Sequence, residues 1–290
     1  MVTFLDGGMG QELLARSALP PTPLWATQVM LETPDIVRAI HDDYFAAGAD
    51  IATTNTYAVH HDRLIPYGVD DRFRDLQEIA CRMAVEARDA HGSGRIAGAI
   101  GPLGASYRPD LAPEPTKAAE LYAEICMIQN PFVDLFLCET VASVEQARGA
   151  LMGTLPFGKP VWLALSVSDD DGLRLRSGEA LSDILPLLVD LPPDAILINC
   201  SPPETVDQGL DVIAQASLPF GAYANGFTHI AEAFRDRGKT ADLLEKRQDL
   251  PPDRYADFAQ GWVARGATIV GGCCEVGPAH IRRMVNTLKG

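Results

Sequence analysis

The stretch Ala195-Ile196-Leu197-Ile198-Asn199-Cys200-Ser201-Pro202-Pro203 carries the pattern that decides the fold. Its first four residues form a short and wholly apolar run, which is typical of a strand buried on both faces of a parallel sheet. Polar and proline residues end the run, and the residues 205–216 that follow have the spacing of an amphipathic helix. The stretch therefore predicts one strand and helix unit of an α/β fold.

The same unit recurs along the whole chain. Further apolar runs that predict buried strands cover residues 3–5, 50–52, 95–100, 133–137, 161–167, 220–223 and 268–270. The other helical patterns cover residues 34–47, 73–91, 116–129, 143–152, 180–189, 253–265 and 278–288. Eight alternating units predict a parallel sheet closed into a (β/α)8 TIM barrel, and we expect residues 1–290 to form one such domain.

An open, doubly wound sheet is the alternative architecture for this alternation. Such sheets often carry a Gly-x-Gly-x-x-Gly turn that binds a dinucleotide after the first strand. The turn at Asp6-Gly7-Gly8-Met9-Gly10 has a different spacing. The sequence thus favours the closed barrel.

Composition excludes several classes of partner. The net charge of −15 at pH 7 opposes binding to a phosphate backbone, so we expect no nucleic acid. The first ten residues have no basic and apolar leader, and no segment approaches the roughly 18 apolar residues that span a bilayer. We therefore expect no membrane partner and a cytoplasmic location, while the oligomeric state is not predicted.

Three of the six cysteines follow predicted strands. Cys200 ends the sixth strand, and Cys273 and Cys274 follow the eighth, directly after Gly271 and Gly272. The carboxyl ends of barrel strands meet at one mouth, and the two glycines allow the backbone to leave strand geometry so that adjacent cysteines can share a ligand. Three thiolates hold zinc and leave its fourth position open for a substrate sulfur.

The spacing of these cysteines leaves two alternatives open: buried apolar cysteines, or a vicinal disulfide between Cys273 and Cys274. Cys81 and Cys126 fall inside helical patterns, and we expect them in the core. Cys138 ends the predicted fourth strand beside Glu139, and its role stays ambiguous.

Zinc chemistry suits methyl transfer to a thiol. A zinc-bound thiol is held in its deprotonated, nucleophilic form. If the methyl donor is a sulfonium or quaternary ammonium cation, the negative zinc and thiolate centre and the positive donor neutralise each other as the methyl moves. A water-poor barrel mouth favours such a transition state.

Several motifs occur in a family-specific order, and on them the chain resembles the zinc-dependent homocysteine S-methyltransferases over nearly its full length. The motifs cover residues 5–13, 47–50, 54–57, 101–105, 139–140, 199–200, 223–225, 271–274 and 278–281. The resemblance implies a (β/α)8 barrel that transfers a methyl group to homocysteine and forms methionine. It also implies that Zn²⁺ is bound by Cys200, Cys273 and Cys274.

The resemblance extends to residues that bind substrate. It implies that Glu139 binds the amino group of homocysteine, since a carboxylate facing an ammonium group is chemically apt. Asp6 ends the first predicted strand, and we expect it to hold the same group or to orient the glycine turn, with a local Asx turn as the alternative. We also expect Asn55 and Asn225 to orient the substrate by hydrogen bonds, with hydrogen bonds to the nearby backbone as the alternative.

The chain departs from the family pattern in loops that would line the donor pocket. Residues 275–278 read Glu-Val-Gly-Pro, where the family usually has Gly-Thr-Thr-Pro, and residues 107–116 and 226–230 also differ. S-methylmethionine or S-adenosylmethionine is the expected donor, because the extra segments of the betaine-using branch are missing from the sequence. Residues 226–252 form either a lid or a surface insertion.

Other functions stay open at this stage. One is a non-catalytic barrel that binds zinc or thiols, and another is a methyltransferase acting on a different thiol or selenol. A barrel aldolase or phosphate-binding isomerase would need a lysine at a strand end or a glycine-rich loop near the last two strands. No predicted strand ends in lysine.

Overall fold

The computed structural model describes residues 1–18, 22, 24, 26–230 and 244–290. Within them, eight parallel strands follow the order β1-β8-β7-β6-β5-β4-β3-β2, and a parallel bridge between Leu5 and Ile51 joins the two ends. This confirms the predicted (β/α)8 barrel. The strands are β1 Thr3–Phe4, β2 Ile51–Thr53, β3 Arg95–Ile100, β4 Leu135–Val141, β5 Val161–Leu165, β6 Ala195–Asn199, β7 Phe220–Tyr223 and β8 Ile269–Val270.

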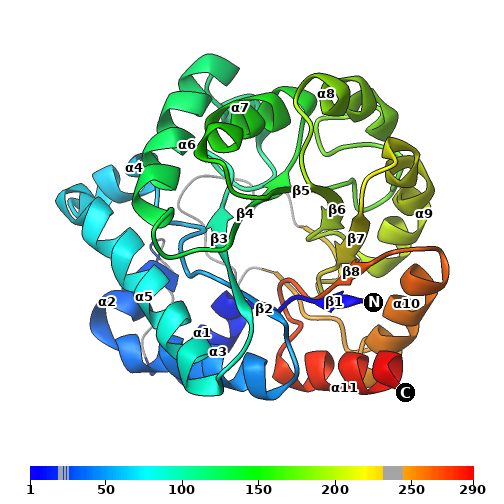
Figure 1. The fold of residues 1–290 in the computed structure, drawn as a ribbon, viewed down its shortest axis with the longest axis horizontal. Helices are drawn as coiled ribbons and strands as arrows, with labels where there is room; N and C mark the ends of the chain where they lie inside the picture. The colour runs from blue at the N-terminus through cyan, green and yellow to red at the C-terminus, as the bar shows by residue number, and fades with distance from the viewer. Residues whose placement is uncertain (19–21, 23, 25, 231–243) are drawn as a thin grey trace.

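The α-helices form a ring outside the barrel (Figure 1). Five of them begin with proline, which fits the first turn because that position needs no N–H donor. The helices are α1 Met9–Arg16, α2 Ala26–Glu32, α3 Pro34–Ala46, α4 His61–Leu64, α5 Phe73–His91, α6 Pro115–Gln129, α7 Val144–Thr154, α8 Leu185–Asp190, α9 Pro203–Ile213, α10 Pro252–Ala264 and α11 Pro278–Lys289. None of these helices is long and apolar enough to cross a membrane.

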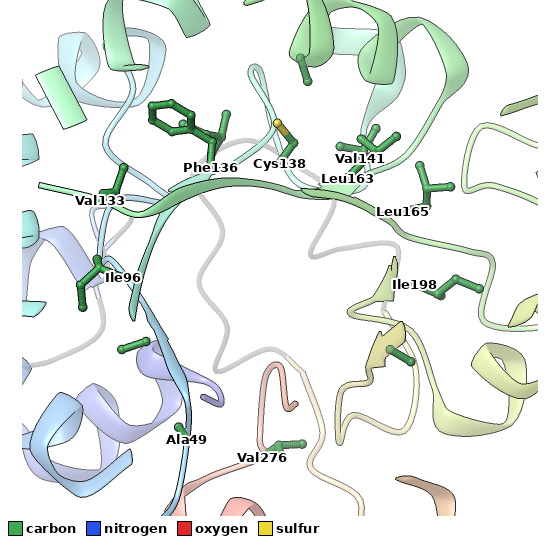
Figure 2. Close-up of a cluster of buried hydrophobic side chains, with 14 of the residues drawn as sticks. Ala49, Ile96, Val133, Phe136, Cys138, Val141, Leu163, Leu165, Ile198 and Val276 are labelled. Atoms are coloured by element: carbon green, nitrogen blue, oxygen red, sulfur yellow. The ribbon is translucent and has the colours of Figure 1, made fainter. Parts of the chain in front are cut away.

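The core has two layers because side chains of a strand alternate between its faces. Phe136, Cys138 and Leu163 point from β4 and β5 toward the helices, as Figure 2 shows. Leu135 and Leu137 belong to a separate cluster inside the barrel. Side chains beyond this inner layer, at the carboxyl ends of the strands, therefore reach the mouth.

The predicted fourth strand, residues 133–137, is placed wrongly. The strand β4 begins at Leu135 and continues to Val141, with a register shift against β5 between Cys138 and Val141. The polar residues Glu139 and Thr140 end the apolar run in the sequence, yet they belong to the strand. Cys138 and Glu139 thus lie within β4 and not after it.

Candidate active site

The carboxyl ends of the strands surround a cavity of about 940 Å³, measured out to its open mouth. Six residues predicted to form the site line this cavity, namely Asp6, Asn55, Glu139, Cys200, Cys273 and Cys274. The structure therefore brings together residues from the loops after β1, β2, β6 and β8 and from the last part of β4.

The sulfur atoms of Cys200, Cys273 and Cys274 lie within 4.8 Å of one another. The Sγ atoms of Cys200 and Cys274 are 3.7 Å apart. Tetrahedral zinc bound at about 2.3 Å to each thiolate places the sulfurs about 3.8 Å apart, so the donor set fits this ion. No other group of three metal-binding side chains lies this close together in the part of the chain that the structure describes.

Cys200 reaches the mouth because its backbone departs from strand geometry. In β6, Ala195 and Leu197 face the barrel interior while Ile196 and Ile198 face the helices. Continued alternation would point residue 200 toward the helices. Instead, Cys200 has a left-handed backbone with a φ of 47°. This conformation turns the side chain toward the other two cysteines.

The loop that carries Cys273 and Cys274 is fixed by backbone hydrogen bonds to the loop after β7. The Cys273 N–H donates to the Ala224 carbonyl at 2.9 Å, and the Cys274 carbonyl accepts from the Gly226 N–H at 2.8 Å. On the other side, Gly8 lies so close that an added Cβ would be 2.6 Å from the Cys273 carbonyl oxygen. Glycine at position 8 is therefore required by this close approach.

In the absence of a cation, the three thiols share their protons unequally. Hydrogen bonds from Cys273 and Cys274 lower the pKa of Cys200 well below its usual value, and Tyr107 adds to this effect. The contact with Cys200 raises the pKa values of Cys273 and Cys274, because three close sulfurs resist carrying three negative charges. A divalent cation among them removes this conflict and lets all three ionise.

Two carboxyl groups line the cavity with the cysteines, Asp6 being buried and Glu139 half-buried. Burial raises the pKa of Asp6 to about 7, although Thr53 donates to it from its N–H at 2.8 Å and its hydroxyl at 3.0 Å. Burial also raises the pKa of Glu139 to about 8, with further contributions from the charges of Asp6 and Cys200. Tyr223 donates to Glu139 at 3.2 Å. An ammonium group between these carboxyls would stabilise both in the ionised form.

The two predicted asparagines occupy different surroundings. Asn55 lines the cavity, and its Nδ2 donates to the Ala26 carbonyl at 3.3 Å. Asn225 is fully buried and does not line the cavity; its Nδ2 lies 4.0 Å from Cys200 Sγ, and its Oδ1 accepts from the Phe227 N–H. Both engage local groups, and their contact with substrate stays a prediction.

Cys81, Cys126 and Cys138 are fully buried in the layer between the barrel and the helices. The first two match the expected core positions. Cys138, whose role the sequence left open, is also a core residue. Its Sγ lies 3.7 Å from the Thr154 hydroxyl, on the helix side of β4.

Two residues of the site were missed by sequence reasoning. Tyr107 lines the cavity and contacts Cys200, and Arg176 lies over the Tyr107 ring. The only signal was that the loop 107–116 differs from the family pattern. For Arg176, in the loop after β5, there was no signal at all.

The segment 226–252 falls partly outside the described residues, since 231–243 are not described. Of the rest, Phe227 and Leu244 line the cavity, and Phe227 forms an antiparallel bridge with Lys246. The loop after the cysteine pair has a left-handed backbone at Glu275, with a φ of 65°. A glycine adopts this conformation without strain, and glycine is the family's usual residue there.

The family model described as homocysteine S-methyltransferase matches residues 3–288. This chain belongs to the homocysteine S-methyltransferase family. The homocysteine S-methyltransferase of Escherichia coli (strain K12) is 28% identical to it, over 97% of this chain and 93% of that protein. Homocysteine S-methyltransferase YbgG of Bacillus subtilis (strain 168) is 27% identical, over 97% of this chain and 92% of that protein. The members are enzymes that methylate a thiol.

A solved structure of this family shares the fold of the chain. The metallated form of the homocysteine methyltransferase MmuM from Escherichia coli superposes with a TM-score of 0.82 and 24% sequence identity. The match covers 100% of this chain and 96% of that one. The likeness supports the barrel and its closure.

Proposed function

We propose that this enzyme transfers a methyl group from a cationic donor to the thiolate of homocysteine and forms methionine, with Zn²⁺ bound by Cys200, Cys273 and Cys274. The observation that carries the proposal is the convergence of these three sulfurs within 4.8 Å in one cavity with the carboxyl groups of Asp6 and Glu139. Residues 1–290 act in this proposal as one barrel domain.

The two ends of homocysteine have matching partners in the cavity. In this proposal Glu139 and Asp6 accept hydrogen bonds from its ammonium group, whose positive charge would offset the desolvation that raises the pKa of both carboxyls. Asp6 is held by Thr53, which leaves Glu139 as the principal acceptor. When bound, the zinc ion supplies an open position that keeps the substrate thiol deprotonated and nucleophilic.

The methyl donor is S-methylmethionine or S-adenosylmethionine in this proposal. Both are sulfonium cations, and aromatic side chains of Tyr57, Tyr107 and Phe227 line the cavity. A buried and largely apolar site favours a step in which a positive donor and a negative thiolate become neutral.

The test is to purify the protein, quantify zinc per chain, and measure methionine formation from homocysteine with a panel of donors. We expect one zinc per chain and turnover with a sulfonium donor. Metal without turnover on any donor would favour the non-catalytic binding barrel. Turnover only with another thiol or a selenol would replace homocysteine as the acceptor.

Two variants test the ligand set. Cys274→Ala is expected to lose zinc and turnover together, because two sulfurs remain in place of three. Cys81→Ala is the matched control, since Cys81 is a buried core cysteine remote from the cavity lining. Equal zinc content in the two purified variants would refute the assignment.

A further inference from the structure

The side chain of Tyr107 contacts one of the three clustered cysteines. Its hydroxyl lies 3.0 Å from Cys200 Sγ, and the residue is 6% exposed. The backbone of Tyr107 is left-handed, with a φ of 61°, which is a strained conformation for an aromatic residue. The surrounding structure therefore holds this side chain in place despite the energetic cost of the strained backbone.

Arg176 fixes the Tyr107 ring from its other side. The guanidinium carbon lies 4.4 Å from the ring centroid, and the side chain is only 2% exposed. Its nitrogens also bond to Asp169 at 2.6 Å, to the Ser166 hydroxyl at 2.7 Å and to the Cys200 carbonyl at 3.2 Å. A buried cation with this many partners is rigid, so the ring stacked on it is rigid too.

The arrangement joins separate loops around Cys200. Asp169, the partner of Arg176, also accepts from the Ile230 N–H at 2.7 Å. The loops after β3, β5 and β7 thus converge on the first residue after β6. Neither Tyr107 nor Arg176 holds the ammonium group or belongs to the expected ligand set, and the place of the Tyr107 ring in the cavity lining does not explain why its hydroxyl contacts Cys200.

We propose that Tyr107 is a positioning residue of the metal centre, whose hydroxyl donates a hydrogen bond to the Cys200 sulfur and whose ring is clamped by Arg176. This inference rests on the proposed zinc site. The direction of the bond follows from chemistry: a sulfur bound to a metal has no proton, so only the hydroxyl can donate.

The hydrogen bond has two physical effects. It fixes the direction of one sulfur lone pair, which leaves another aimed at the point between the three sulfurs. It also draws electron density from this sulfur, which moderates the negative charge of a centre with three thiolates. Partners of this kind behind metal ligands typically change metal affinity by about 10-fold to 100-fold.

The test uses Tyr107→Phe in the full-length protein, loaded with Co²⁺ as a spectroscopic substitute for zinc. Loss of the donated hydrogen bond raises the energy of the sulfur lone pairs, so the sulfur-to-cobalt charge-transfer band is expected to move to longer wavelength. Zinc affinity, measured by competition with a chromophoric chelator, is expected to fall about tenfold. Tyr122→Phe is the matched control, because Tyr122 is buried and its hydroxyl accepts from the Leu103 N–H, away from the cysteines.

A second variant keeps the ring and changes only the strength of the donor. Tyr107→3-fluorotyrosine has a more acidic hydroxyl, so the band is expected to move to shorter wavelength, opposite to the shift in Tyr107→Phe. An unchanged band, or shifts of the same sign in both variants, would overturn the inference. If the wild-type protein itself gives no thiolate-to-cobalt band, the zinc site of the proposed function fails instead.

Discussion

Asn199 holds Thr140 through both ends of its side-chain amide. The Asn199 Oδ1 accepts from the Thr140 N–H at 2.9 Å, and its Nδ2 donates to the Thr140 hydroxyl at 3.1 Å. Asn199 is fully buried, and Thr140 has a left-handed backbone with a φ of 61° where β4 shifts register against β5. The last residue of β6 thus fixes the bulge directly after Glu139, which sets where that carboxylate lies.

Asn199→Ala is predicted to weaken the binding of homocysteine. The change removes two hydrogen bonds and leaves the buried Thr140 N–H without its acceptor, which costs about 1–3 kcal/mol. We expect the KM for homocysteine to rise about tenfold while the zinc content stays unchanged. Thr140→Ser keeps both bonds and serves as the control. A KM equal to that of the wild type in Asn199→Ala would contradict the role of this contact.

The affinity for amino acids is predicted to rise with pH up to about 8. Glu139 and Asp6 must be ionised to accept an ammonium group, and burial raises their pKa values to about 8 and about 7. We expect the inhibition constant of L-2-aminobutyrate, which has the amino and carboxyl groups of homocysteine without the sulfur, to fall up to about tenfold per pH unit between 6 and 8.

In Glu139→Gln, only Asp6 still titrates. The improvement in binding with pH should therefore be smaller and should end near pH 7. Because the inhibitor has no thiol, the titration of homocysteine itself does not enter the measurement. A flat profile in the wild-type enzyme would argue against the carboxyl groups as the ammonium site.

Gly8→Ala is predicted to disrupt the cysteine cluster. The new Cβ would lie 2.6 Å from the Cys273 carbonyl oxygen and 3.1 Å from the Cys274 Cα, so the loop must move away. We expect zinc content and turnover to fall together, while the circular dichroism spectrum of the barrel persists. Gly261→Ala is the control: it lies in α10 with nothing within 4 Å of an added Cβ, and it should stabilise the protein by about 0.5–1 kcal/mol.

Acid is predicted to destabilise the barrel through His41. This residue of α3 is fully buried, neither of its ring nitrogens has a hydrogen-bond partner among the described residues, and burial lowers its pKa to about 4. The unfolded chain, with a histidine pKa of about 6.5, therefore binds the proton first as the pH falls. The protein therefore has its full free energy of unfolding above pH 6.5, where His41 is neutral in both states. Part of this free energy is lost as the pH falls from 6.5 to 4.

The measurement is urea unfolding of the wild type and of His41→Leu at pH 7, 6, 5 and 4. As the pH falls from 7 to 4, the free energy of unfolding of the wild type should decrease by about 3 kcal/mol more than that of His41→Leu. His91→Gln, at the exposed end of α5, is the control. Parallel curves for the wild type and His41→Leu would show that His41 does not carry the effect.

Much of the barrel could be predicted because its strands are buried on both faces and so read as short apolar runs. Arg95–Ile100 and Phe220–Tyr223 match the predicted bounds. Helix α5 also ends as predicted, at His91, where the left-handed backbone of Gly92 stops it. The prediction failed at β4, where the mouth requires a carboxylate inside the strand and so breaks the apolar pattern.

The active site, like the barrel, has residues that could be predicted from the sequence and residues that could not. Cys200 and the cysteine pair could be located from the sequence because residues at strand ends must face the mouth. The contacts of Tyr107 and Arg176 could not, since they depend on a left-handed loop residue and on a buried pair between Arg176 and Asp169. Such loop conformations follow from tertiary packing, which leaves no periodic signal in the chain.

Cys200 and Cys274 lie 74 residues apart in the chain, and the cysteine pair follows β8, the strand that pairs with both β7 and β1. A chain shortened before β8 would hold only Cys200 of this set. The proposed zinc site would therefore assemble only once β8 has closed the barrel against β1, so that metal binding and closure of the sheet would stabilise each other.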